Sequence, residues 1–408
     1  MVTPRERVRA ALSHAVPDRV PVDVGGTLAT SITSAAYGPL RAHLGLPAEE
    51  LVIFEQTQQL PYLGEDLLVR LGVDTRVVAL PRERALTPEL IDDGEYWAWI
   101  DPWGARLRMP KRGGLYYDWT GHPIPDVTDK AVAAYRWPAF ETDDELAAIR
   151  AEAVRLRTDT DYALVGSANL GSGIFEQGCL LAGMETFMMA MVADRPVAER
   201  LLDGITDFLI EEASRYLAQM GPYLDAYIYG DDVATQGGWM ISPDTYTQLI
   251  KPRQRRLFDA IHARTDAKLI YHGCGAVFDL IPHLIDIGVD VLNPVQVSAK
   301  GMDSARLKSA YGRDIVFWGG GVDTQRVLPF GTPDEVRAEV RRRVGDFAPG
   351  GGFVFAPVHN IQAGVPPQNI VAAFDAVREF GAWPRNRHQK ELPHGRRPVH
   401  GLAHDVVV

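Results

Sequence analysis

A histidine and a cysteine stand two residues apart in YHGC (271–274), at the end of the apolar run AKLIYHGC. Residues two apart on a strand face the same side, so His272 and Cys274 would project together, with Gly273 between them leaving room. Imidazole and thiolate bind Zn²⁺, and three protein ligands with one open position form a catalytic zinc site. Buried free cysteines and hydrogen-bonded strand-end histidines are also common. The pair is therefore a candidate metal site that needs a third ligand, and His359, at the end of the last apolar run, could supply it.

Carboxylates form a second group of candidates. Asp23, Asp74, Asp231 and Asp232 lie in or at the ends of other apolar runs, and Glu176 lies in the glycine-containing segment NLGSGIFEQGC. Such groups could ligate a metal, donate a proton or contact a cationic substrate group, and they could equally cap helices or pair with arginines. We interpret Asp23, Asp232 and Glu176 as candidate catalytic residues. The remaining candidates are substrate contacts in the same loops: Asp231, Asn169, Trp239, Asn360 and Gln362.

Eight apolar runs must position these side chains. They cover 19–26, 72–80, 161–169, 224–232, 267–274, 289–295, 314–321 and 351–360. Their apolar residues are consecutive rather than alternating, which is typical of parallel strands buried on both faces, and helical patterns lie between most of them. About eight strands alternating with helices favour a (β/α)₈ TIM barrel, whose catalytic groups project from the carboxyl ends of the strands. An open doubly wound sheet is the alternative, but no dinucleotide-binding fingerprint follows the first run.

Composition places the chain among globular proteins. Of its 408 residues 46% are hydrophobic and 23% are charged, and the net charge of -11 leaves no electrostatic footprint for nucleic acid or an anionic membrane. With two cysteines, no signal core and no apolar run of about 20 residues, we expect a soluble cytoplasmic protein. Cys179, the second cysteine, is expected inside a helix in a structural role.

The chain is expected to form one domain, residues 1–383, followed by a disordered tail, 384–408, that lacks periodicity. Thr3 and Glu6 have capping-box spacing and Pro4 suits a first helical position, which predicts a helix at the N-terminus. Residues 95–119 alternate and turn on Asp-Pro and Gly-Gly, so they predict a β-hairpin insertion, either a lid or an oligomer contact. A homodimer is compatible with this insertion.

Several of these motifs resemble those of the uroporphyrinogen decarboxylase superfamily. They are TPRERVRAALSHAVPDRVPVD, YHGCGAVFDLIPHLIDIGVDVLNPVQ, and GGGVDTQRVLPFGTPDEVRAEVRRRV with the following GGFVFAPVHNIQAGVPPQNIVAAFDAVREFG. The resemblance spans residues 3–381 and implies a (β/α)₈ barrel. Its decarboxylase branch is metal-free and binds substrate carboxylates through an arginine-rich motif after the first strand. Here that region has no arginine before Arg41, which argues against haem biosynthesis.

The other branch contains the methylcobalamin:thiol methyltransferases and related corrinoid-linked demethylases. Its members resemble this chain in the His-x-Cys at 272–274, and their third zinc ligand is usually a cysteine where His359 stands. The decarboxylase branch has a histidine at that place too, so His359 does not discriminate. The resemblance implies a zinc ion and the transfer of a methyl group between a corrinoid and a small thiol, methoxy or methylamine substrate. It also implies a partner protein that carries the corrinoid, because the corrinoid-binding motif D-x-H-x-x-G does not occur here. A metal-free decarboxylase or lyase acting on a carboxylated substrate is the alternative function, and a non-catalytic binding scaffold is a third.

Overall fold

Seven parallel strands form the central sheet of the computed structural model, which describes residues 1–85, 88–168 and 172–382. In spatial order they are β3 (Thr75–Val78), β8 (Ala163–Gly166), β9 (Ala226–Gly230), β12 (Lys268–His272), β13 (Val291–Asn293), β14 (Val316–Trp318) and β15 (Phe353–Val354). Each pairs in parallel with its neighbour. Each lies within one of the predicted apolar runs, and the strands are short and almost wholly buried, as the consecutive apolar pattern requires.

The first predicted run joins the two ends of this sheet. Val22 bridges Phe355 in parallel, and the Asp23 N–H donates to the Phe355 carbonyl at 2.8 Å. On the other side, the Asp74 N–H donates to the Val22 carbonyl at 2.8 Å. The segment around Val22 therefore lies between β15 and β3 and closes the sheet into a barrel, which confirms the (β/α)₈ prediction.

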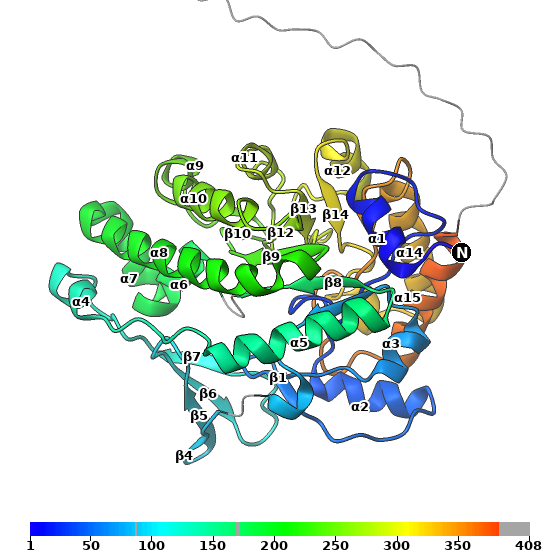
Figure 1. The fold of residues 1–408 in the computed structure, drawn as a ribbon, viewed down its shortest axis with the longest axis horizontal. Coiled ribbons are helices and arrows are strands. Elements are labelled where there is room, and N and C mark those ends of the chain that lie inside the picture. Colours follow the sequence, from blue (N-terminus) through cyan, green and yellow to red (C-terminus); the bar gives the residue numbers. More distant parts are fainter. Residues whose placement is uncertain (86–87, 169–171, 383–408) are drawn as a thin grey trace, which may run out of the picture.

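Helices surround the barrel and connect its strands (Figure 1). The longer ones are α2 (Ser34–His43), α3 (Glu65–Leu71), α5 (Asp143–Asp159), α6 (Ile174–Ala182), α7 (Met184–Ala193), α8 (Arg195–Met220), α10 (Lys251–His262), α12 (Ser304–Tyr311), α14 (Pro333–Phe347) and α15 (Pro367–Phe380). Shorter ones are α4 (Asp129–Ala134), α9 (Pro243–Thr245), α11 (Ile281–Asp286) and α13 (Val327–Phe330). The hydrophobic core between this helical layer and the sheet is one continuous cluster.

The N-terminal helix α1 (Pro4–Leu12) packs against the interior of the barrel. Its Val8, Ala11 and Leu12 belong to the same buried cluster as strand residues such as Ile270 and Val354. The predicted capping box is present: the Thr3 side chain accepts from the Glu6 N–H, and the Thr3 N–H donates to the Glu6 carboxylate. This cap satisfies two otherwise orphaned donors where the helix begins.

Asp74 lies just before β3, at the amino end of that strand. Its carboxylate is buried and accepts hydrogen bonds from Arg7, Arg19 and the Val22 N–H. These bonds tie the closing segment and α1 to the sheet. Asp74, considered among the acidic candidates, is therefore a structural group at the end of the barrel opposite the predicted site.

The segment interpreted as a hairpin insertion lies within a separate antiparallel sheet. It has the order β4 (Ile91–Asp93), β5 (Tyr96–Ile100), β6 (Arg106–Pro110) and β7 (Asp118–Gly121), and lies beside the barrel in Figure 1. Two small hairpins complete the strands: β1 (Ile53–Glu55) with β2 (Leu60–Pro61), and β10 (Ala234–Thr235) with β11 (Gly238–Trp239). Across the described residues, no helix is both long and apolar enough to cross a bilayer. The predicted tail, 384–408, lies outside the described residues.

Candidate metal centre

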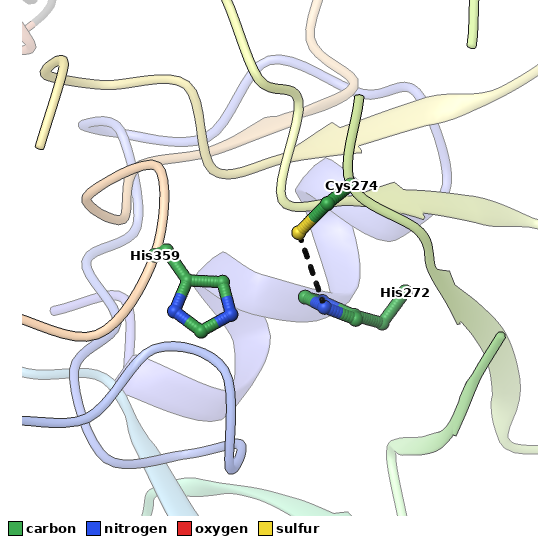
Figure 2. Close-up of side chains that lie close together, drawn as sticks. All are labelled: His272, Cys274 and His359. Carbon is green, nitrogen blue, oxygen red and sulfur yellow. Dashed lines mark hydrogen bonds between the residues drawn. The ribbon is translucent and has the colours of Figure 1, made fainter. Parts of the chain in front are cut away.

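His272, Cys274 and His359 point toward one another from two distant segments of the chain (Figure 2). His272 ends β12, Cys274 follows two residues later, and His359 lies in the loop after β15. One nitrogen of each imidazole and the Cys274 sulfur all lie within 4.8 Å of one another. The parallel barrel brings the carboxyl ends of these two distant strands to the same mouth, so the three residues expected to act together do meet.

The donor set fits a tetrahedral zinc ion. Bond lengths of about 2.0 Å to nitrogen and 2.3 Å to sulfur place neighbouring ligand atoms about 3.5 Å apart. The Cys274 Sγ lies 3.7 Å from His272 Nε2. Burial and the neighbouring His272 lower the pKa of His359 to about 3, so this imidazole is neutral at pH 7 and its nitrogen lone pair is available to a metal.

Asn293 determines which nitrogen of His272 faces the centre. It pairs with His272 across β12 and β13, and its side chain is wholly buried. Its amide nitrogen Nδ2 donates to the Trp318 carbonyl at 2.9 Å, so its Oδ1 is the atom that lies 2.6 Å from His272 Nδ1. Because Oδ1 can only accept, His272 Nδ1 carries the hydrogen and Nε2 presents a lone pair to Cys274 and His359. Histidines that bind metals usually donate their other ring N–H to a neighbouring acceptor in this way, which fixes the tautomer and the orientation of the ring.

The Cys274 thiol lies beside two carboxylates. Its backbone N–H donates to Asp232 Oδ1 at 2.7 Å, which fixes the loop after β12. Burial, with the charges of Asp232 and Glu176, raises the pKa of the Cys274 thiol well above its usual range. A divalent cation would offset both effects and favour the thiolate, so the surroundings suit a metal ligand better than a free nucleophile.

Glu176 lies in the first turn of α6, not in a glycine-rich loop as the sequence suggested. Burial and the nearby Asp232 carboxylate raise its pKa to about 8. Two of the three predicted catalytic carboxylates, Glu176 and Asp232, are thus neighbours behind Cys274. Their catalytic roles stay predictions.

The structure gives Asp231 a role other than the predicted substrate contact. Its carboxylate is wholly buried and accepts hydrogen bonds from four donors: the Phe175 and Glu176 N–H groups, Tyr229 Oη and Gln254 Nε2. The two backbone donors begin α6, so Asp231 caps that helix from a neighbouring strand. Burial raises its pKa to about 6.

Asp23, predicted to be a catalytic acid, is likewise enclosed by protein. Each carboxylate oxygen accepts from two donors, among them Thr75 Oγ1, Thr30 Oγ1 and Trp318 Nε1. Burial raises its pKa. Asp23 accepts from the Trp318 side chain, and the Trp318 carbonyl accepts from Asn293, which in turn orients His272. Asp23 therefore anchors β14, the strand that holds Asn293 in place. We therefore assign it to positioning rather than to proton transfer.

The other predicted substrate contacts are dispersed. Trp239 packs against Tyr246 and His283, and Asn360 is buried with its amide bonded to Ser31 and Gln58. Gln362 is half-buried and donates to the Asn360 carbonyl. Asn169 lies outside the described residues. The buried Cys179 lies inside α6, in agreement with the structural role expected of it.

A cavity of about 370 Å³ opens beside the centre. It is lined by Ala234, Thr235, Gln236, Cys274, Gly275, Gln296, Thr324, Gln325, Val358 and His359. Ala234, Thr235 and Gln236 come from the segment that follows β9. Sequence reasoning missed Asn293 and Gln296, although both lie in NPVQ at the end of the sixth predicted strand. The rule that strand ends carry the site could have identified them.

The chain was compared with solved structures, with curated proteins and with protein-family models. A methyltransferase from Methanosarcina mazei has the same fold, with a TM-score of 0.61 and 21% identity over 93% of this chain and 99% of its own. A β-glycosidase from the hyperthermophile Thermosphaera aggregans is 12% identical over 78% of this chain and 86% of its own, and its TM-score of 0.37 is too low to support an argument. No curated protein matches. The uroporphyrinogen decarboxylase (URO-D) family model matches residues 112–380, well over half of the chain. The chain therefore belongs to the URO-D family.

Proposed function

We propose that this protein is a zinc-dependent methyltransferase of the URO-D family. It moves a methyl group between a small substrate and a corrinoid carried by a partner protein. The observation that carries the proposal is the convergence of His272, Cys274 and His359, three zinc-type ligands with a cavity beside them. The methyltransferase from Methanosarcina mazei, whose fold the chain shares, is in keeping with it.

Zinc would be held by His272 Nε2, Cys274 Sγ and one nitrogen of His359. When bound, zinc with an open fourth position supplies a Lewis acid that favours the thiolate form of a bound thiol near neutral pH. Neighbouring residues of the protein would keep the zinc ligands in position. Asn293 keeps the hydrogen of His272 on Nδ1, and Asp232 holds the Cys274 backbone in place.

The cavity argues against the alternative, a metal-free decarboxylase acting on a carboxylated substrate. Carboxylates are usually bound by guanidinium or ammonium groups. Among the described residues that line the cavity there is no arginine and no lysine. The first arginine after Asp23, Arg41, is engaged elsewhere, because its guanidinium pairs with Asp66.

The test begins with metal analysis of the purified protein. We expect one zinc per chain, lost in His272→Ala and in Cys274→Ser. The zinc-loaded protein is then incubated with methylcobalamin and a series of small thiols, and loss of the cobalt–carbon bond is followed by visible absorbance. In parallel, tagged protein is used to capture a small corrinoid protein. Absence of stoichiometric zinc, together with an active His272→Ala variant, would refute the proposal and restore the metal-free lyase.

A further inference from the structure

Gln296 presents the NH₂ end of its side-chain amide to the cavity beside the candidate metal centre. The residue is only 7% exposed and lines the cavity. Its Oε1 accepts from the Gly275 N–H at 2.7 Å, which fixes the amide so that Nε2 is the free end. Within the described part of the chain, Nε2 has no hydrogen-bond acceptor. Although the residue is largely buried, Nε2 itself is accessible from the cavity, so a ligand that supplies an acceptor can bind to it there.

A second amide on the cavity wall has the same polarity. Gln325 is exposed and its Oε1 accepts a long hydrogen bond of 3.5 Å from Ser298 Oγ, so its NH₂ group can also face the cavity. Gly275 lies against the Thr235 carbonyl so closely that a Cβ there would come within 2.5 Å of it. Only glycine fits at this position, and its N–H holds Gln296 Oε1, which leaves Gln296 Nε2 facing the cavity. The wall therefore offers hydrogen-bond donors without a formal charge.

Charged and aromatic head groups find poorer partners here. An anion would meet no cationic side chain among the described lining residues, and Asp232 and Glu176 lie behind Cys274. A cation would meet no carboxylate among the described lining residues, and the Gln296 oxygen is already engaged by the Gly275 N–H. The described lining also contains no Phe, Tyr or Trp ring on which a quaternary ammonium or an aromatic group could stack.

We propose that this cavity binds a neutral aliphatic substrate whose amide, hydroxyl or ether oxygen accepts a hydrogen bond from Gln296 Nε2. The inference rests on the proposed function, which identifies the reacting atom of the substrate. That atom would face Cys274 and His359. It adds the class of the substrate and names the residue that recognises it. Sites that hydrogen-bond a substrate group discriminate strongly against analogues that leave the partner unpaired.

Three short thiols test this inference: 3-mercaptopropionamide and 3-mercaptopropionate, which match in size, and the smaller cation cysteamine. Their affinities are measured by calorimetry on the zinc-loaded and on the zinc-free protein. We expect the neutral amide to bind at least about tenfold more tightly than either charged thiol. The preference should persist without zinc, because Gln296 is not a metal ligand. A protein that binds no zinc would thus refute the proposed function and still report the selectivity.

The variant Gln296→Glu keeps the acceptor for Gly275 and removes the free donor. We expect it to lose most of the preference for the amide over cysteamine. Gln219→Glu, the same change at an exposed position of α8, is the matched control and should leave all three affinities unchanged. Equal or tighter binding of 3-mercaptopropionate overturns the inference, as does an unaltered amide preference in Gln296→Glu.

Discussion

Asn293 makes two hydrogen bonds that two substitutions can separate. Its Oδ1 accepts from His272 Nδ1 and its Nδ2 donates to the Trp318 carbonyl. Leucine removes both bonds in a side chain of similar size, whereas aspartate keeps the acceptor and loses the donor. We therefore expect zinc affinity to follow the contact with His272, and stability of the metal-free protein to depend on both contacts.

The size of each effect follows from burial. In Asn293→Leu, the His272 N–H and the Trp318 carbonyl both lose their partner, and each buried unpaired group costs about 1–3 kcal/mol. The free energy of unfolding should then fall by about 2–6 kcal/mol in total. Loss of the partner that orients a metal-ligating histidine weakens metal binding by about 10–100-fold. In Asn293→Asp, stability should fall by at least about 1–3 kcal/mol, while zinc affinity stays within about threefold of the parent or increases, because a carboxylate makes the imidazole more basic.

Zinc affinity is measured by competition with a chromophoric chelator, and stability by urea unfolding of the metal-free protein. Asn369→Leu is the control, because Asn369 is equally buried and donates to two backbone carbonyls, those of Leu328 and Gly331. It should lower stability without changing zinc affinity. If Asn293→Asp lost zinc as severely as Asn293→Leu, or if the control did, the assigned role of Asn293 would be wrong.

Three further predictions concern the same centre and one remote carboxylate. His359→Cys should retain stoichiometric zinc, since thiolate replaces imidazole as a ligand, whereas His359→Ala should weaken zinc binding at least about a hundredfold in the same chelator competition. Removal of zinc by a chelator should lower the melting temperature, because a ligand at about a thousand times its Kd adds about 4 kcal/mol to stability; an unchanged melting temperature would contradict a bound metal. Burial and the neighbouring Glu141 raise the pKa of Glu212 from 4.5 to about 8, so the folded state retains a proton there and stability falls as pH rises through this range. Glu212→Gln should remove about 3–5 kcal/mol of that decline, measured by urea unfolding at pH 5 and pH 9.

The barrel and its candidate metal ligands could be predicted from the amino-acid pattern. Consecutive apolar residues indicate strands buried on both faces, and their alternation with helical periods leaves few architectures. His272 ends β12 and Cys274 lies two residues beyond it, so their closeness in sequence places both at the same end of one strand. His359 could be added because a closed barrel brings the carboxyl ends of all its strands to one mouth.

The role of each carboxylate depends on residues that are distant from it in the sequence. Asp23 and Asp231 carry the same charge at similar strand ends as Asp232, yet the first two are enclosed by donors from distant elements and the third lies beside Cys274. Local pattern contains no information about which buried donors surround a carboxylate, because those donors arrive through tertiary packing. The same holds for Asn293 and Gln296, whose amides acquire their orientation from the Trp318 carbonyl and the Gly275 N–H. Residue types and spacing thus determined the fold and the candidate metal ligands, and packing alone determined the contacts of the surrounding polar groups.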